Sequence, residues 1–246
     1  MGFRIDFVNG KGPVVLNPVY HAGDLKRLGK LSGLDHVGRT IKLINAVLPP
    51  SIPLIGFAGS PYTVATYLCP RHHHMMFEAP QAFHELMDLL TNNTILYLKQ
   101  QKEAGIKVFQ LFDTWAGNLR HEDYEAFVLP YVEKIFKAVK LPSIYYLKHG
   151  PHLLDLMEKS GAEILSVCET VNIKDMKTKK GIQGNLLNSL LYADEKTLIE
   201  ETRKVLKSAK LKHKKYIFNL SHGVMADVNP LKLKLVVDEV HRFKWV

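Results

Sequence analysis

Short apolar runs alternate with longer amphipathic segments along most of the chain, and this alternation is the feature that most restricts its fold. Each run is too short for a helix and is bounded by turn residues, which is the pattern of a buried strand. Strands that alternate with helices form parallel βαβ units, so the sequence predicts an α/β protein with a parallel sheet. The six predicted strands are residues 53–57, 108–112, 142–147, 163–167, 181–185 and 216–220.

The stretch Pro53–Leu68, PLIGFAGSPYTVATYL, is the unit around which the others are organised. Its strand runs almost directly into a helix, with Ser60 as the N-cap and Pro61 at the first helical position. Such a junction places small residues and free backbone N–H groups at the carboxyl end of the sheet, where α/β proteins bind their ligands. We therefore expect a ligand to approach closely there.

A small or polar cluster follows every predicted strand. A (β/α)8 TIM barrel displays its site in this way, and we predict that fold. A doubly wound open sheet is the alternative, but no Gly-x-Gly-x-x-Gly and no Gly-Lys-Ser/Thr phosphate loop follows any strand. The clusters are residues 58–60, 113–114, 148–150, 168–170, 184–185 and 221–223.

The remaining segments predict one domain over residues 1–246, with residues 1–18 forming a β-hairpin at its rim. The turn of this hairpin is predicted at residues 9–12, and Asp194 is expected to cap a helix. The predicted helices are residues 24–48, 80–104, 122–139 with a break at Pro130, 194–206 and 230–243.

Composition excludes several classes of protein. The net charge of +9 lies mostly between apolar runs, without interleaved aromatic residues or a nucleic-acid motif, so we expect a solvated basic surface and no nucleic-acid partner. The two cysteines, Cys69 and Cys168, lack a metal or redox spacing, which fits a reducing compartment. No signal-peptide pattern and no apolar run of about 18 residues occurs, so we expect a soluble, cytoplasmic protein without a membrane partner.

Three successive histidines, His72 to His74, raise the question of a metal site. Neighbouring residues on an extended chain point to opposite sides, and a metal would need further ligands nearby. We therefore predict a solvated loop here and no metal.

Four blocks of the sequence have the order and similar spacing of the blocks of a known family. They are PLIGFAGSPYTVATYL, VFQLFDTWAGNL, GIQGNL with LYA a few residues further on, and YIFNLSHGVMADVNP. With these blocks the chain resembles uroporphyrinogen decarboxylase over nearly its whole length. The resemblance implies a TIM barrel that works as a cytoplasmic homodimer without cofactor or metal. It also implies removal of CO2 from the four acetate side chains of uroporphyrinogen III to give coproporphyrinogen III in haem biosynthesis.

The resemblance further implies a set of site residues. Tyr67, Thr114 and His222 match positions that contact the substrate in the family, and Phe57 and Phe112 match apolar residues that wall the macrocycle. From spacing alone, Tyr67 would also fit a packed side chain, Thr114 a helix cap and His222 a hydrogen-bonded core histidine. The chemistry requires an acid, a charge-stabilising carboxylate and cations for the substrate carboxylates. The net charge of +9 suits a substrate with eight carboxylates.

Two elements of the family do not occur in these 246 residues. In the family, two further strands carry an Arg-Gln-Ala-Gly-Arg motif, which grips substrate carboxylates, and an aspartate that binds the pyrrole nitrogens. We therefore assign no catalytic residue, and expect the chain alone to lack most of the activity. We also expect an incomplete barrel with about six of the eight βα units, from a truncated or degenerate copy.

Two other functions belong to different classes. One is a non-catalytic remnant that binds porphyrinogen or a partner barrel, which the absent motifs favour. The other is a zinc- and corrinoid-linked methyltransferase, a class that resembles this family in fold. It would need a His-x-Cys pair and a later cysteine as zinc ligands, and Cys168 has no such partner.

Overall fold

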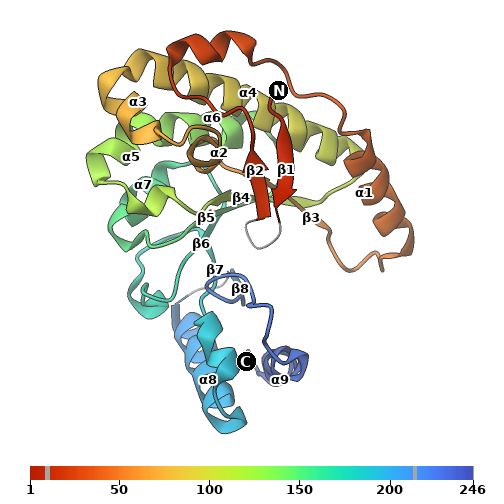
Figure 1. The fold of residues 1–246 in the computed structure, drawn as a ribbon. Coiled ribbons are helices and arrows are strands. Elements are labelled where there is room, and N and C mark those ends of the chain that lie inside the picture. Colours follow the sequence, from red (N-terminus) through yellow and green to blue (C-terminus); the bar gives the residue numbers. More distant parts are fainter. Residues whose placement is uncertain (9–11, 213–214, 246) are drawn as a thin grey trace.

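A six-stranded parallel sheet forms the centre of the molecule (Figure 1). The computed structural model describes residues 1–8, 12–212 and 215–245. Strands that are neighbours in the sheet are consecutive in the chain, in the order β3-β4-β5-β6-β7-β8. The strands are β3 Ile55–Gly59, β4 Val108–Asp113, β5 Ser143–Leu147, β6 Ile164–Ser166, β7 Gly181–Gln183 and β8 Tyr216–Ile217.

An α-helix or a short 3-10 helix follows each of these strands. The predicted hairpin is present as β1 Ile5–Val8 and antiparallel β2 Gly12–Val15, while residues 9–11 of its predicted turn lie outside the described residues. The α-helices are α1 Asp35–Val47, α2 Pro61–Leu68, α3 His72–Glu78, α4 Pro80–Ala104, α5 His121–Phe127, α6 Leu129–Ala138, α7 Leu154–Lys159, α8 Glu195–Lys212 and α9 Pro230–Arg242. The 3-10 helices are η1 Ala22–Arg27, η2 Ala116–Asn118, η3 Pro151–Leu153, η4 Ile173–Asp175 and η5 Asn188–Tyr192.

Side chains on the inner face show that the sheet is strongly curved. Gln183 of β7 donates its Nε2–H to Oε1 of Gln110 on β4 at 3.2 Å, although β5 and β6 lie between these strands. In a flat sheet, three strand spacings would separate the two strands by about 14 Å. Consecutive parallel strands with crossovers of one hand place their helices on the outer face and curve the sheet as in a (β/α)8 barrel. The predicted barrel-type fold, with six βα units, is confirmed.

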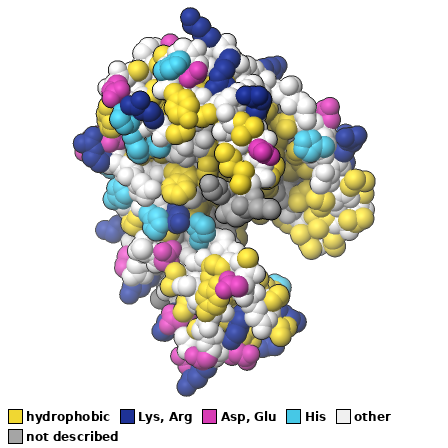
Figure 2. All heavy atoms as spheres, viewed as in Figure 1, with side chains coloured by type: hydrophobic (Ala, Val, Ile, Leu, Met, Phe, Trp, Pro, Cys, Tyr) yellow, Lys and Arg dark blue, Asp and Glu magenta, His cyan; other side chains and the backbone are white. Residues whose placement is uncertain are grey.

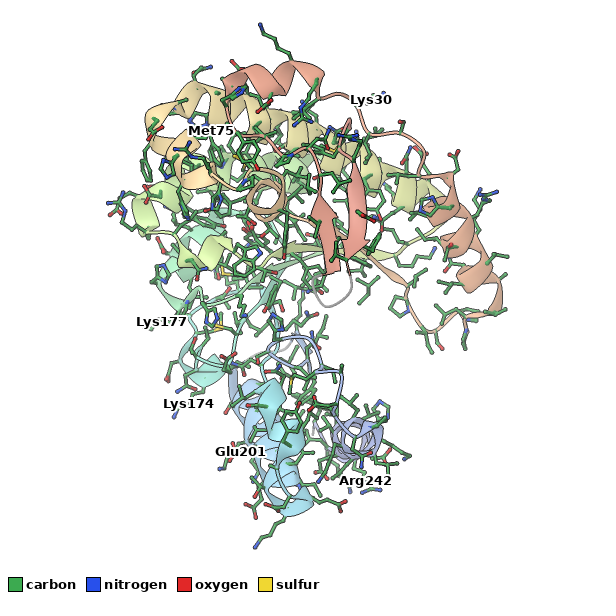
Figure 3. The ribbon with its side chains drawn as sticks, in the orientation of Figure 1. Lys30, Met75, Lys174, Lys177, Glu201 and Arg242 are labelled. Atoms are coloured by element: carbon green, nitrogen blue, oxygen red, sulfur yellow. The ribbon has the colours of Figure 1, made fainter. Side chains whose placement is uncertain are left out.

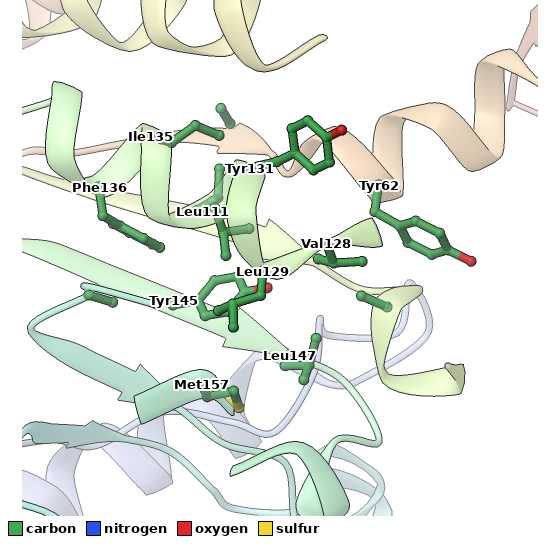
Figure 4. Packing of buried hydrophobic residues seen from close by; sticks show 14 of the residues in the cluster. Tyr62, Leu111, Val128, Leu129, Tyr131, Ile135, Phe136, Tyr145, Leu147 and Met157 are labelled. Carbon is green, nitrogen blue, oxygen red and sulfur yellow. The ribbon is translucent and has the colours of Figure 1, made fainter. Parts of the chain in front are cut away.

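The main core lies between the outer face of the sheet and the helices that cover it (Figure 4). Leu111 of β4 and Tyr145 of β5 are fully buried there, against side chains such as Ile135 of α6. Removal of these apolar surfaces from water is the main force that holds the helices on the sheet. A smaller cluster packs the lower part of Figure 1, where α8 and α9 lie. Its buried members are Leu186, Leu191, Leu198, Val228 and Val236.

The sheet ends at β3 and β8, and the β3 end exposes apolar side chains. Leu43 and Val47 of α1 are 72% and 83% exposed, and Phe57 of β3 is 60% exposed. Figure 2 shows hydrophobic atoms gathered over α1 and the loop that follows it. An open edge and an uncovered inner face are what a sheet of six strands leaves when the barrel is not closed.

Charged side chains are spread over the surface. Lys174 and Lys177, between β6 and β7, lie at the periphery of the molecule (Figure 3). Arg203 of α8 pairs with Glu239 of α9 at 2.6 Å and joins the two helices of the lower part. Within the described ranges, no helix combines the length and the apolar character needed to span a membrane.

One long predicted helix is wrong. Residues 24–48 were expected to form a single helix, but the chain makes the 3-10 helix η1 and begins α1 only at Asp35. Gly29 and Gly33 interrupt the pattern, and Gly33 has φ +75°, which a right-handed helix cannot contain. By contrast, α4 has the predicted bounds and ends at Gly105 in the left-handed conformation.

The loop predicted around the three histidines is also wrong, because residues 72–78 form α3. The His72 ring packs edge-on to Tyr62 at 5.8 Å, and burial lowers its pKa. His74 Nδ1 lies 3.2 Å from Glu78 one turn later. Among the described residues, no group of three or more His, Cys, Asp or Glu side chains is placed to hold a metal ion.

Of the two predicted helix caps, one is confirmed, and the last predicted strand is shorter than expected. Asp194 caps α8 by accepting the Thr197 N–H at 3.0 Å, as expected. Ser60 is the residue before α2, but its side chain makes no capping hydrogen bond. The strand predicted at 216–220 is regular only to Ile217, after which Leu220 forms an isolated bridge to Leu186.

A glutamine side chain occupies the free edge of β3. The Gln101 amide accepts from the Phe57 N–H at 3.1 Å and donates to the Phe57 carbonyl at 2.9 Å, as a neighbouring strand would. We expect Gln101→Ala to lower the free energy of unfolding by about 1–2 kcal/mol, because both backbone groups lose their partner. Urea denaturation measures this, with Gln100→Ala as the matched control on the exposed side of α4. Equal effects of the two substitutions would contradict the prediction.

Candidate active site

Aromatic rings form a row across the inner face of the sheet. The Phe57 ring of β3 meets the Phe112 ring of β4 edge-on at 6.0 Å, and Phe112 meets Tyr146 of β5 at 5.7 Å. Phe112 pairs directly with Tyr146 on β5 and with Gly59 on β3. Phe57 is two residues before Gly59 and therefore lies on the same face of the sheet. The two predicted wall residues, Phe57 and Phe112, are therefore brought together in a row of edge-to-face aromatic rings.

The row leads into a cavity of about 350 Å³ at the carboxyl ends of the strands. Thr114 and His222, both predicted site residues, line it from the ends of β4 and β8. Tyr146 crosses beneath it and donates its hydroxyl to the Ser221 carbonyl at 3.0 Å, which fixes the 219–223 segment against β5. The full lining is Gln110, Phe112, Thr114, Tyr146 and residues 219–224.

Tyr67 is not among the residues that line this cavity. It lies on α2, is 60% exposed, and meets the Trp115 ring edge-on at 6.4 Å. Since Trp115 directly follows Thr114, Tyr67 is linked to the end of β4 through this ring contact. A hydroxyl so exposed is free to meet a ligand that extends beyond the cavity.

Positive charge gathers around His222. The pKa of His222 is lowered below its usual value by desolvation, by the nearby Lys148 charge and by His149, while Glu169 opposes the change. Lys148 and His149 follow β5 directly. At neutral pH the His222 imidazole is therefore neutral and can donate or accept a hydrogen bond, and the ammonium group of Lys148 supplies the fixed charge.

Asp113 lies next to Thr114 but on the opposite, helix-covered face of the sheet. It is fully buried and accepts hydrogen bonds from the hydroxyls of Thr63 and Tyr145, each at 2.8 Å. Burial raises its pKa, although the hydrogen bonds from Thr63 and Tyr145 act against the rise. Asp113 thus joins β4 to α2 and β5 and belongs to the packing beneath the site.

Several lining residues carried no usable signal in the sequence. Tyr145 and Tyr146 are adjacent in one apolar run, and only the pleat of β5 sends the first into the core and the second into the cavity. Ser221 belongs to the predicted polar cluster at residues 221–223, but nothing in the sequence shows that its hydroxyl is buried. Lys148 belongs to the predicted polar cluster at residues 148–150, and the effect of its charge on His222 follows only from the fold.

Comparison with known proteins decides the family. The family model described as uroporphyrinogen decarboxylase (URO-D) matches residues 1–243. A relative from Thermodesulfovibrio yellowstonii, named uroporphyrinogen decarboxylase, is 38% identical over all of this chain and 76% of its own length. A relative of the same name from Nocardia farcinica is 36% identical over 98% of this chain and 73% of its own length. The chain belongs to the uroporphyrinogen decarboxylase family.

Solved structures support the fold of this family member. A methyltransferase from Methanosarcina mazei has a TM-score of 0.84 at 21% identity, with 99% of this chain and 76% of that chain covered. A B12-independent methionine synthase from Shewanella sp. W3-18-1 has a TM-score of 0.65 at 13% identity, with 97% and 73% covered. At such identities the likeness concerns the fold alone. The uroporphyrinogen decarboxylase family member therefore shares its architecture with these two proteins.

Proposed function

We propose that the chain acts as a uroporphyrinogen decarboxylase, removing CO2 from the acetate side chains of uroporphyrinogen III to give coproporphyrinogen III. The observation that carries this proposal is the cavity in which Thr114 and His222 meet at the end of the aromatic row. Apolar rings for the macrocycle stand beside polar and cationic groups for its carboxylates. This division suits a flat ligand whose charges lie only at its periphery.

The described residues supply part of the chemistry. Loss of CO2 from an acetate leaves a carbanion, so the pyrrole must first be protonated at a ring carbon to accept the electron pair. Neutral His222 and the Thr114 hydroxyl can hydrogen-bond the reacting or spectator carboxylates, and Tyr67 can reach a carboxylate outside the cavity. Phe57 and Phe112 hold the macrocycle and exclude water from it.

The same proposal includes the setting in which the chain works. We place it in the cytoplasm as a homodimer, with uroporphyrinogen as ligand and without a cofactor, and treat residues 1–246 as a single incomplete barrel with a rim hairpin at 1–18. The expected solubility, the family relationship and the continuous core across α2 to α7 support this description. Sedimentation velocity of the purified chain measures whether it sediments as a dimer.

The experiment that tests the function is decarboxylation of uroporphyrinogen by the purified chain under anaerobic conditions, followed as coproporphyrinogen. The Arg-Gln-Ala-Gly-Arg motif does not occur in the 246 residues, so the assay is run with and without a polypeptide that carries the family's two strands with this motif and the aspartate. We expect activity mainly in the presence of the added polypeptide, because arginine forks and a buried carboxylate are not easily replaced.

Each result has a distinct meaning. Full activity of the chain alone would show that the Arg and Asp groups are dispensable. Activity only with the added polypeptide would support the proposed function and assign this chain the Thr114 and His222 side of the site. No activity in either assay, with the chain folded by circular dichroism, would support the remnant that binds porphyrinogen without turnover.

A further inference from the structure

Lys148 stands where β5 meets the mouth of the cavity. The last register pair of β4 and β5 is Asp113 with Leu147, so Thr114 and Lys148 each leave the sheet directly after this pair. Lys148 begins the turn after β5, two residues beyond Tyr146, which lines the cavity. The Lys148 charge also lowers the pKa of the His222 imidazole, which lines the cavity.

The turn that carries Lys148 is held in a defined conformation. His149 has φ +56°, which is uncommon for a residue with a Cβ. Gly117 passes directly against the Lys148 carbonyl, where a Cβ would overlap the oxygen, so the backbone of Lys148 has little freedom. Lys148 is half-buried, and its ammonium group makes no hydrogen bond or ion pair with any described residue. A cation held in this way is prepared for an anion from outside the chain.

Ser221 provides an independent indication of a ligand at the same place. Its side chain is 1% exposed and lines the cavity beside His222. Among the described residues, its Oγ has no hydrogen-bond partner. Buried hydroxyls are normally paired, because an unpaired one loses its bonds to water without replacement. An acceptor atom in the cavity would satisfy it.

The groups around this point favour a carboxylate over a cation or a neutral ligand. His222 lines the cavity, and the charged or titratable groups that act on it are Lys148, His149 and Glu169, of which only Glu169 is acidic. Thr114 adds a further hydroxyl. One ammonium with hydroxyl and imidazole donors matches the charge and the two oxygens of a carboxylate.

We propose that Lys148 and Ser221 bind one side-chain carboxylate of the tetrapyrrole substrate, between Thr114 and His222. The Lys148 ammonium forms the ion pair, and the Ser221 hydroxyl donates a hydrogen bond to the same carboxylate. This inference rests on the proposed function, and it adds to the site a cation and a donor that the resemblance did not supply. Anchoring one carboxylate here sets the rotation of the macrocycle against the Phe57 and Phe112 rings.

The test measures binding of uroporphyrin, the oxidised octacarboxylate, by fluorescence quenching. We expect Lys148→Met to weaken binding at least tenfold and to reduce its salt dependence, and Ser221→Ala to weaken it about threefold. Lys148→Arg should retain most of the affinity, which controls for folding and charge together. Lys107→Met is the matched control, because it removes an exposed lysine at the amino end of β4. We expect it to leave binding within twofold of the wild type.

A second readout separates this inference from the proposed function. The His222 imidazole is titrated by NMR with and without succinate, in the wild type and in Lys148→Met. We expect a saturable succinate-induced shift that the substitution abolishes, together with a rise in the His222 pKa when the Lys148 charge is removed. If uroporphyrin neither binds nor reacts while succinate behaves as expected, the proposed function fails and the carboxylate site stands. If Lys148→Met binds uroporphyrin as the wild type does, or succinate shifts nothing, the inference is overturned.

Discussion

Asp113→Ala should lower the free energy of unfolding by about 3 kcal/mol, the largest stability change we expect from a single polar substitution. The substitution leaves the hydroxyls of Thr63 and Tyr145 without their acceptor in a site closed to water. Tyr145 retains its contact with the Tyr124 hydroxyl at 2.7 Å, which limits the loss. Urea denaturation followed by circular dichroism measures the change.

Asp88→Ala is the control for Asp113→Ala. Asp88 is an exposed carboxylate that pairs with Lys134 at 3.0 Å on the surface, so its removal should change stability several times less. If both substitutions lowered the free energy of unfolding by the same amount, the hydrogen bonds of Asp113 would not be what joins β4 to α2 and β5.

The pH dependence of stability gives a second test of Asp113. Its pKa is raised in the folded state, so just above the unfolded-state value of about 4 the folded protein holds this proton while the unfolded chain has lost it. The unfolded state then binds fewer protons, and the contribution of Asp113 to stability falls as pH rises through this window. Asp113→Asn should remove this fall. Comparison of the wild type and the asparagine variant between pH 4 and pH 7 isolates it, and parallel curves would contradict it.

His222→Ala should lower the rate of decarboxylation about 100-fold and leave stability nearly unchanged. The ring is exposed at the mouth of the cavity, so little packing is lost. It is, however, the imidazole that meets the substrate in the proposed site. The measurement is coproporphyrinogen formation in whichever assay is more active, with the chain alone or with the added polypeptide.

His36→Ala is the matched control for His222→Ala, since His36 is exposed on the first turn of α1, far along the chain from the cavity. Its rate should equal that of the wild type. A His222→Ala variant with unchanged rate and unchanged uroporphyrin affinity would remove His222 from the site.

The sequence by itself determined the order of the elements. These elements depend on interactions between residues that are near one another in the chain, so the sequence pattern predicts them without knowledge of the fold. Examples are the apolar runs of strand length, the periodicity of α4 and the glycine that ends α4. The same holds for Asp194, which caps a helix three residues away. The family blocks placed Thr114, His222 and the two phenylalanines, and the structure brings these four to one face of the sheet.

Only the tertiary structure decided which side chains face each other across the curved sheet. Tyr145 and Tyr146 are alike in sequence, yet one binds Asp113 in the core and the other supports the cavity. Tyr146 and Ser221 lie 75 positions apart and are joined by a hydrogen bond because β5 and the segment after β8 approach through the curvature of the barrel. Such contacts depend on the register of the strands and on the curvature that closes the barrel, and no pattern of neighbouring residues encodes either. The side chains that make up the site could therefore be identified only from the fold.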